Sequence, residues 1–247
     1  MQYMTENSTG TYSNNTLIYI IIIITVIIII CIFCGCTNRS NNEYMGNLGA
    51  KFNVTFRTNW GQRGTQNVIN YPKPPKEEAP HTGNMFLAIH NSNYNPFTLG
   101  KNASKGVAES SMYGTNDTLI QEISNNRRNY NKYYTAPVLK TPGEYTFNVT
   151  ANQKYPLMSF VTMIAPSPDW FTGVSSVNLM DIKKSKVIPV YTYDAGTDHG
   201  TKFVTFPKHP RGRNTKPISY LTSGEMFPNG LRSNIPPIGF IEIKRTY

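Results

Sequence analysis

Two stretches, PLMSFVTMIAPSPDW at 156–170 and KVIPVYTYDAGTDHG at 186–200, each place an acidic loop directly after a strand-like run. The first run, Met158 to Ile164, is apolar and β-rich, and the prolines at 166 and 168 end it, so Asp169 is expected just past a strand. The second run, Val187 to Tyr193, stops at DAGTD, where a glycine permits a tight turn that can fold both carboxylates toward one point.

The three aspartates of these loops, Asp169, Asp194 and Asp198, form a candidate site for a hard cation. Carboxylate oxygens suit calcium, whose coordination by six to eight oxygens tolerates ligands from separate loops better than that of magnesium does. The alternative is that they are solvated side chains, because Asp-Gly turns with exposed carboxylates are common. The spacing alone leaves both interpretations open.

Longer strings resemble one known family. MSFVTMIAPSPDWFTGVSSVNL at 158–179 and YTYDAGTDHGT at 191–201 are similar to the spondin N-terminal domain of F-spondin and mindin-type matrix proteins. KFNVTFRTNW, HTGNMFLAIHNSNYNPFTLGKNASKGV and PGEYTFNVTAN fit the same family in the same order, so the resemblance covers most of residues 50–245. It implies an antiparallel β-sandwich related to C2 domains, one calcium ion on aspartates that match Asp169, Asp194 and Asp198, and adhesion or binding without catalysis.

Residues 1–16 are a polar tail, and residues 17–36 form the uncharged run LIYIIIIITVIIIICIFCGC. About 20 such residues are enough for a helix to cross a hydrocarbon core of about 30 Å. A cleaved signal peptide is the alternative, but no Lys or Arg precedes the run, which is longer than the usual apolar region of about 7 to 15 residues. The sequence therefore predicts a transmembrane helix over 17–36, a linker over 37–50 and a folded domain over 51–247.

All three cysteines, Cys31, Cys34 and Cys36, lie in this apolar run. We therefore expect no disulfide in the folded domain, and no thiolate for zinc binding or nucleophilic attack. Arg39 and Lys51 follow the run and no cation precedes it, which favours a cytoplasmic domain. The family resemblance favours an extracellular one, so the sequence leaves the side of the membrane open.

Alternating apolar residues predict further strands at 52–56 and 145–149, and strands are also expected at 85–89 and 238–245. Helix-like spacing over 105–112 and 117–124 predicts two short helices between strands. The segment NNRRNYNKYYT at 125–135 mixes cations with tyrosines, but no RRM or OB pattern surrounds it, so a solvated loop is favoured over a site for single-stranded nucleic acid. The predicted fold class is all-β, an antiparallel β-sandwich with short helical insertions.

The charge balance is the main bulk signal, because the chain carries a formal net charge of +10 at pH 7. Such an excess favours polyanions, which include phospholipid headgroups, sulfated glycans and nucleic acid. The densest basic segment is TKFVTFPKHPRGRNTKP at 201–217, which contains no acid; a solubilising loop is the alternative. The residues predicted to bind a polyanion are Lys202, Lys208, Arg211, Arg213 and Lys216.

The sequence contains no Gly-rich phosphate loop, no G-x-S-x-G elbow and no H-E-x-x-H motif, so we predict no enzyme and no small-molecule substrate. The predicted function is a membrane-anchored adhesion or scaffold module with a structural calcium ion. We expect its partner to be a protein or a polyanionic surface and do not expect nucleic acid. The alternative, suggested by the Ile, Asn and Tyr richness, is a structural membrane protein of a large DNA virus that ties the virion bilayer to a protein shell.

Overall fold

The computed structural model describes residues 22–26, 29–30, 49–58, 60, 79–198, 200–204, 216–227, 230 and 235–247. The chain divides into two compact units, residues 1–48 and residues 49–247. In the first unit the described residues are helical, and within the described chain we find no helix whose length and apolar character suffice to cross a bilayer. The rest of the predicted span over 17–36, and the predicted linker as far as residue 48, lie outside the described residues.

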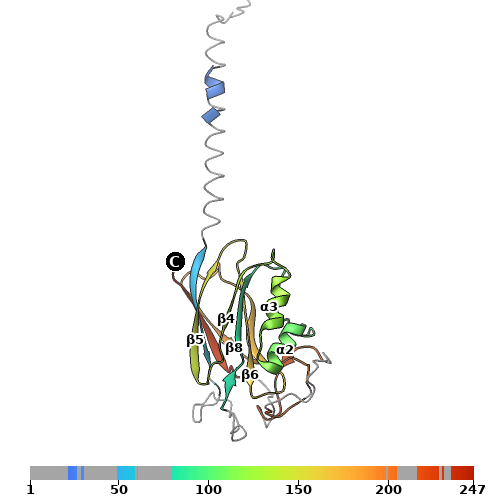
Figure 1. The fold of residues 1–247 in the computed structure, drawn as a ribbon. Helices are drawn as coiled ribbons and strands as arrows, with labels where there is room; N and C mark the ends of the chain where they lie inside the picture. The colour runs from blue at the N-terminus through green and yellow to red at the C-terminus, as the bar shows by residue number, and fades with distance from the viewer. Residues whose placement is uncertain are drawn as a thin grey trace, which may run out of the picture. The chain divides into compact units, whose positions relative to one another are not determined.

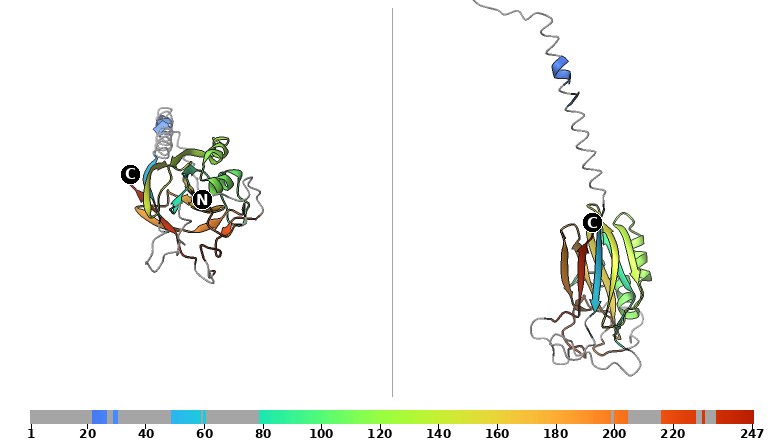
Figure 2. Two further views of the ribbon diagram at one scale, coloured as in Figure 1. Left: turned by 60° about the horizontal axis from the view of Figure 1, so that its bottom comes forward. Right: turned by 90° about the vertical axis from the view of Figure 1, so that its left-hand side faces the viewer.

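The second unit is a β-sandwich, and the smaller of its two sheets has four antiparallel strands (Figures 1 and 2). In spatial order they are β5 (Gly143–Ala151), β1 (Ala50–Thr58), β11 (Gly239–Arg245) and β8 (Ser185–Val190). The apolar side chains of β1 alternate with polar ones, and its apolar face is buried. This strand therefore has the period of two expected where one face of a sheet meets a core and the other meets water.

The larger sheet has seven strands, also paired antiparallel. Six follow in the order β10 (Ser219–Tyr220), β9 (Thr192–Asp194), β7 (Trp170–Asn178), β6 (Leu157–Ala165), β3 (Met85–His90) and β4 (Tyr130–Ala136), and β2 (His81–Thr82) pairs with β6. Every residue of β3 is buried, and nearly every residue of β6. Both faces of this sheet are therefore covered, which explains the apolar run that the sequence shows at 158–164.

Two helices cover the outer face of the larger sheet, α2 (Lys105–Tyr113) and α3 (Asp117–Ser124) (Figure 2, left). Their apolar residues pack against the sheet in a second core, separate from the core between the sheets, and both helices confirm the predicted ones. The second core includes Phe86, Val107, Leu119, Ile123, Val161 and Phe171. The core between the sheets includes Phe52, Phe56, Leu87, Phe147, Phe160 and Ile241.

Antiparallel pairing gives the sandwich two distinct ends. Ala50 at the start of β1 pairs with Ala151 at the end of β5, and Ser185 at the start of β8 pairs with Lys244 near the end of β11. The turn 152–156 leads directly from β5 into β6, so the smaller and the larger sheet share this end. The opposite end carries the loops with the three candidate aspartates. Strands of nine residues at about 3.3 Å per residue separate the two ends by roughly 25–30 Å.

Two predicted elements were wrong. The run from Val187 to Tyr193 is not one strand, because β8 pairs with β11 in the smaller sheet and β9 pairs with β7 in the larger one. The chain crosses between sheets at Tyr191, where no glycine or asparagine marks a turn. The predicted loop at 125–135 contains most of β4, an edge strand that needs a partner on one side only and finds it in β3.

Candidate calcium site

Asp169 ends the short connection between β6 and β7 and is completely buried. Within this connection the Trp170 N–H donates to Ser167 Oγ at 3.1 Å. Strand pairing then sets the neighbour of Asp169, because Asp194 at the end of β9 lies opposite Trp170 at the start of β7. The Ala195 N–H donates to the Asp169 carbonyl at 3.1 Å. Two acidic residues far apart in sequence are thus held side by side by the end of one ladder.

The loop after β9 turns sharply at Gly196, whose φ is +73°. A side chain there would be strained, and a Cβ would lie 2.0 Å from the Lys216 carbonyl oxygen. The Lys216 N–H donates to the Gly196 carbonyl at 3.1 Å, which fixes the loop against the segment before β10. Gly196 therefore has the role that the sequence predicts, a tight turn between Asp194 and Asp198.

One oxygen of Asp169 is fully engaged by this loop. Asp169 Oδ2 accepts hydrogen bonds from the Thr197 N–H at 2.7 Å, the Thr197 hydroxyl at 2.9 Å and the Asp198 N–H at 2.8 Å. The other oxygen, Oδ1, is buried and has no hydrogen-bond partner among the residues that the structure describes. Burying a carboxylate oxygen without a partner costs free energy, so a cation or a proton bound at this atom would stabilise the folded state.

The other two aspartates stabilise their own loop. Asp194 Oδ1 accepts from the Gly196 N–H at 2.7 Å, and Asp198 Oδ1 accepts from the Gly200 N–H at 2.8 Å. Asp198 is buried and Asp194 is half-buried. Gly200 lies directly against Pro168, since a Cβ on it would be 2.8 Å from the proline Cβ. The loop that carries Asp198 therefore packs against the connection that carries Asp169.

Burial is the main cause, and the neighbouring charge of Asp194 the second, of a rise in the pKa of Asp169 to about 7. The hydrogen bonds from Asp198 and Thr197 oppose this shift, because they favour the ionised carboxylate. The raised pKa means that an isolated negative charge is poorly tolerated here. A bound cation would reverse that balance.

The chemistry of these residues fits a hard cation, since they offer carboxylate oxygens and one of those oxygens, Asp169 Oδ1, has no hydrogen-bond partner among the described residues. Over the residues that the structure describes, no three or more His, Cys, Asp or Glu side chains are gathered as a ready metal-binding group. Asp169, Asp194 and Asp198 lie on adjoining loops, each with one oxygen in a hydrogen bond to those loops. The fold thus places the three predicted aspartates on neighbouring loops, but their side chains do not form a ready-made coordination shell.

The predicted polyanion residues are only partly described. Lys202 and Lys216 are exposed at the same end of the sandwich as the aspartates. Lys208, Arg211 and Arg213 lie outside the described residues.

Sequence reasoning missed Thr197, which makes two of the three hydrogen bonds to Asp169 Oδ2. Its position between Asp194 and Asp198 was the available signal, because a residue inside a turn of two aspartates projects its N–H and hydroxyl toward the same loops.

Comparison with known proteins places this geometry in context. A family model described as Spondin_N matches residues 50–228, which run from β1 past β10. The matched segment ends before β11, whereas the sequence resemblance was expected to extend to residue 245. All three candidate aspartates lie within the matched segment.

Two groups of relatives are similar to the chain. Spondin-2 of Homo sapiens is 29% identical over 161 residues, which are 62% of this chain and 47% of that protein. Spondin-2 of Rattus norvegicus is 28% identical over a segment of the same length. Spondin-1 of Bos taurus is 29% identical over 168 residues, which are 62% of this chain and 20% of that protein. The similarity therefore spans about half of the Spondin-2 proteins and a fifth of Spondin-1.

Proposed function

The chain belongs to the Spondin_N family, and on that premise we propose that residues 51–247 form a non-catalytic adhesion or scaffold domain stabilised by one calcium ion. We propose further that residues 17–36 tether the domain to a membrane. Its partner would be a protein or a polyanionic surface. The relatives are much longer than the matched segment, so this role is assigned to the domain alone.

The observation that carries the calcium proposal is the buried, unpartnered Oδ1 of Asp169 beside the loop of Asp194 and Asp198. Calcium would supply positive charge at this oxygen and draw the remaining carboxylates toward it. The chain's own part is to hold the site in place, because Thr197 and the Asp198 N–H orient Asp169 through Oδ2. We assign the ion a structural role, in keeping with a domain that binds partners and carries out no reaction.

The anchor proposal rests on the sequence of residues 17–36, twenty residues without a charged side chain. Eleven of these twenty residues are isoleucine, a residue type that is usually buried away from water, as it is in the hydrocarbon core of a bilayer.

Thermal unfolding of the full chain in detergent, with calcium titrated from a chelated start, tests the site. The free energy of unfolding should rise as RT ln(1 + [Ca]/Kd), roughly 2.7 kcal/mol at a hundredfold excess over Kd. Asp198→Asn keeps the side-chain shape and removes one charge, so it should weaken calcium binding while the domain stays folded. Asp181→Asn is the matched control, because Asp181 is exposed near the opposite end. A melting temperature that calcium leaves unmoved, with no metal retained on purification, would overturn the calcium site.

Two further measurements test the tether and the role. Extraction with alkaline carbonate should leave the chain in the membrane, and its mature N-terminus should precede residue 17. Release by carbonate, or a chain that starts after residue 36, would rule out the anchor. Surface labelling of intact cells should recover the chain cross-linked to a partner protein. Purified virus particles that contain it in amounts comparable with their shell protein would instead assign a structural role in an envelope.

A further inference from the structure

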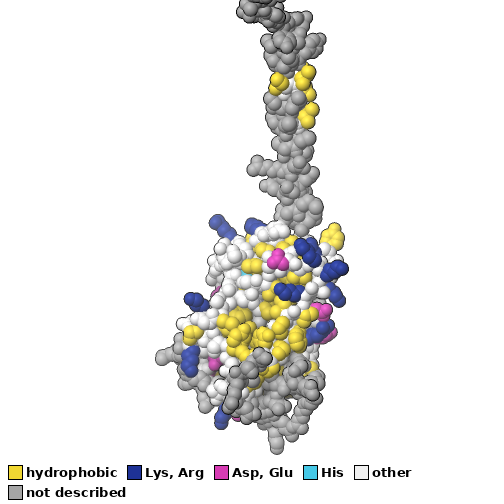
Figure 3. Space-filling view, turned by 180° about the vertical axis from the view of Figure 1, so that it is seen from behind, with side chains coloured by type: hydrophobic (Ala, Val, Ile, Leu, Met, Phe, Trp, Pro, Cys, Tyr) yellow, Lys and Arg dark blue, Asp and Glu magenta, His cyan; other side chains and the backbone are white. Residues whose placement is uncertain are grey.

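Most cations of the described part of the domain lie at the end of the sandwich where β1 begins, and we call it the basic end (Figure 3, upper part of the domain). Five segments build it, residues 49–53, 125–134, 151–156, 179–187 and 243–247, and they contain one acidic residue, Asp181. Their ten cations are Lys51, Arg127, Arg128, Lys132, Lys154, Lys183, Lys184, Lys186, Lys244 and Arg245. Ten cations against one acid account for most of the net charge of +10 on the whole chain.

Backbone hydrogen bonds hold these segments together. The Lys51 N–H donates to the Tyr247 carbonyl at 3.1 Å, and the Arg245 N–H donates to the Lys184 carbonyl at 2.8 Å. These bonds join the start of β1, the end of β11 and the segment before β8. On the larger sheet, the Asn91 N–H donates to the Asn129 carbonyl at 2.9 Å, which fixes the segment before β4 at the end of β3. The charge cluster is therefore a property of the fold, assembled from parts that are far apart in sequence.

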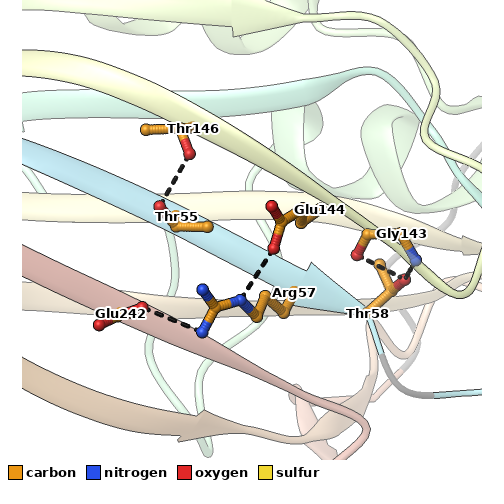
Figure 4. Close-up of polar contacts among 7 residues, drawn as sticks. All are labelled: Thr55, Arg57, Thr58, Gly143, Glu144, Thr146 and Glu242. Atoms are coloured by element: carbon orange, nitrogen blue, oxygen red, sulfur yellow. Dashed lines mark hydrogen bonds and ion pairs between the residues drawn. The ribbon is translucent and has the colours of Figure 1, made fainter.

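The cations of the basic end are not neutralised by acidic neighbours. Among the described residues, the ion pairs are made by Arg57 and Lys105, neither of which belongs to the basic end. Arg57, near the other end of β1, shows the contrast, since its guanidinium lies 2.9 Å from both Glu144 and Glu242 (Figure 4). All ten cations of the basic end except the half-buried Arg245 are exposed. Their charges therefore add to a positive potential that is directed into the solvent.

Tyrosines lie among these cations. The Lys51 ammonium lies 5.8 Å from the ring centre of Tyr247, and the Lys132 ammonium lies 5.0 Å from that of Tyr134. Lys154 lies 5.1 Å from the ring centre of Tyr155 in the turn between β5 and β6. Tyrosine has an apolar ring and a polar hydroxyl, so it suits the boundary between headgroups and water.

We propose that the basic end docks on the anionic headgroups of a phospholipid bilayer. This inference deepens the proposed function and rests on the tether over residues 17–36. Only residues 37–48 separate that run from Gly49, and twelve residues span at most about 43 Å when fully extended. A tethered bilayer is therefore present at high effective concentration at the end of the domain where the cations gather. A nucleic acid or a free glycan would have to reach the same surface from solution.

Docking in this way turns the other end of the sandwich outward. The aspartate loops lie roughly 25–30 Å from the basic end along the strands, so they would point away from the bilayer. Lys202 and Lys216 of the predicted polyanion run lie with those loops and would also point away. The lipid-binding surface is thus a different set of residues from the one that the sequence predicts.

The test uses the full chain, reconstituted into vesicles of phosphatidylcholine alone or of phosphatidylcholine mixed with phosphatidylserine. Lysines are acetylated briefly, and the rate at each lysine is measured by mass spectrometry. With phosphatidylserine, lysines of the basic end should react several-fold more slowly, while Lys140, Lys202 and Lys216 should be unchanged. The difference should vanish near 1 M salt, where the Debye length is about 3 Å.

Two triple variants sharpen the test. Changing Lys183, Lys184 and Lys186 to Gln should abolish the protection of Lys51 and Lys244. Changing Lys140, Lys202 and Lys216 to Gln removes the same charge from the other end and should leave that protection intact. Both sets are exposed, so both variants should retain the wild-type circular dichroism spectrum.

Failures of the two proposals are distinguishable by flotation of the same vesicles. A chain that floats in high salt but whose basic-end lysines react equally on both membranes would overturn the docking and leave the tether standing. Protection by phosphatidylserine in a chain that high salt strips from the vesicles would support the docking and overturn the tether. Protection by heparin or DNA on neutral vesicles, with none from phosphatidylserine, would overturn the docking.

Discussion

Asp169 is the central residue of the candidate calcium site, because its two carboxylate oxygens have different surroundings. Its Oδ2 is bound by three donors, which need an acceptor, while its Oδ1 is buried without a partner. An asparagine can satisfy the first requirement, since its carbonyl oxygen accepts the same hydrogen bonds. It removes the buried negative charge but also removes the attraction for a cation.

Asp169→Asn should therefore act in opposite directions with and without calcium. In a chelator near pH 8 the variant should melt at or above the temperature of the wild type, because a buried charge next to Asp194 is gone. The calcium-induced rise in melting temperature should be absent. Parallel melts in chelator and in calcium measure both effects. A variant that is destabilised in chelator and still responds to calcium would contradict this account of Oδ1.

His90 is a second buried titratable residue, and its hydrogen bonds define a neutral ring. Nδ1 lies 2.8 Å from the Asn91 carbonyl and so must carry the proton, which leaves Nε2 to accept from the Ser159 hydroxyl at 2.8 Å. Ser159 Oγ in turn accepts from the Ser176 N–H at 2.9 Å. The ring also makes an edge contact with Tyr94. Burial lowers the pKa of His90 below 6.5, because a charged imidazole would lose its water here.

This arrangement predicts that His90 lowers the stability of the folded domain in mild acid. The unfolded His90 takes up a proton near pH 6.5, while the folded one resists protonation to lower pH, so below 6.5 the unfolded state binds more protons. The contribution of His90 to the free energy of unfolding should then fall as the pH drops from 7 to 5, at a rate of up to about 1.4 kcal/mol per pH unit. Asp169, whose pKa is raised to about 7, contributes in the opposite direction over the same range, so the effect of His90 is read from the difference between the wild type and a His90 variant. Denaturant melts at pH 7 and pH 5 should therefore show a more favourable change in the free energy of unfolding for His90→Gln than for the wild type, because the variant lacks the buried imidazole. An equal change in the two proteins would remove His90 as a cause.

At the scale of elements, two carboxylates join α2 and α3. Glu109 on α2 accepts from the Thr118 hydroxyl on α3, and Glu122 on α3 binds the start of α2. Glu122 on α3 accepts from the Gly106 N–H at 2.7 Å through Oε1 and from the Ser104 hydroxyl at 2.8 Å through Oε2. Ser104 also caps α2, because its Oγ accepts from the Val107 N–H at 3.2 Å. A negative charge thus lies at the N-terminus of α2, where the free N–H groups and the helix dipole favour it.

Glu122→Gln should loosen both helices from the sheet. The amide nitrogen cannot accept, so one of the two hydrogen bonds is lost together with the charge, at a cost of about 1–2 kcal/mol. Glu144→Gln is the comparison, since Glu144 makes an exposed pair with Arg57 and should matter much less (Figure 4). Urea denaturation of the two variants measures the difference. An equal effect of both substitutions would show that the contact between the helices adds nothing beyond a surface ion pair.

How far the sequence predicts these elements depends on how many sides of each are covered. The alternation in Phe52, Val54 and Phe56 is plain because one face of β1 meets water, and α2 begins after the capping Ser104 and ends before Gly114. The segment NNRRNYNKYYT is too polar to predict a strand, yet β4 forms because one neighbour is enough at an edge. The change of sheet at Tyr191 has no local signal in the sequence. It follows from long-range pairing, because β8 pairs with β11 in the smaller sheet and β9 pairs with β7 in the larger one.

The aspartates were predictable from their turn, but their neighbours were not. DAGTD announces a tight turn, whereas the hydrogen bonds from Thr197 to Asp169 depend on the pairing of β7 with β9. The basic end was not predicted at all. The sequence shows its densest charge at 201–217, while the fold gathers ten cations from five segments that each contain only one to three. Long-range contacts bring these segments together, so no short stretch of the sequence shows the complete surface.

At the scale of the whole molecule, the domain should be independent of what precedes it. Both clusters of buried side chains are built by residues from Ala50 onward. Residues 49–247 expressed alone should remain soluble and melt at the temperature of the full chain in mild detergent. In a domain of this size each 1 kcal/mol is worth roughly 2–4 °C, so calorimetry can resolve a small dependence. A clearly lower melting temperature for the shortened chain would show that residues 1–48 contribute to the fold.

The position of β1 has a mechanical consequence. This strand begins at the basic end and lies between β5 and β11, with its hydrogen bonds perpendicular to its length. A pull between residue 49 and a partner held at the aspartate loops runs along the strands, so it loads both ladders in shear, and their bonds must fail together. A pull between residue 49 and the end of β11 would instead peel the two strands apart, one bond after another. The same sheet is thus strong against tension from a partner and weak against tension across its own two ends.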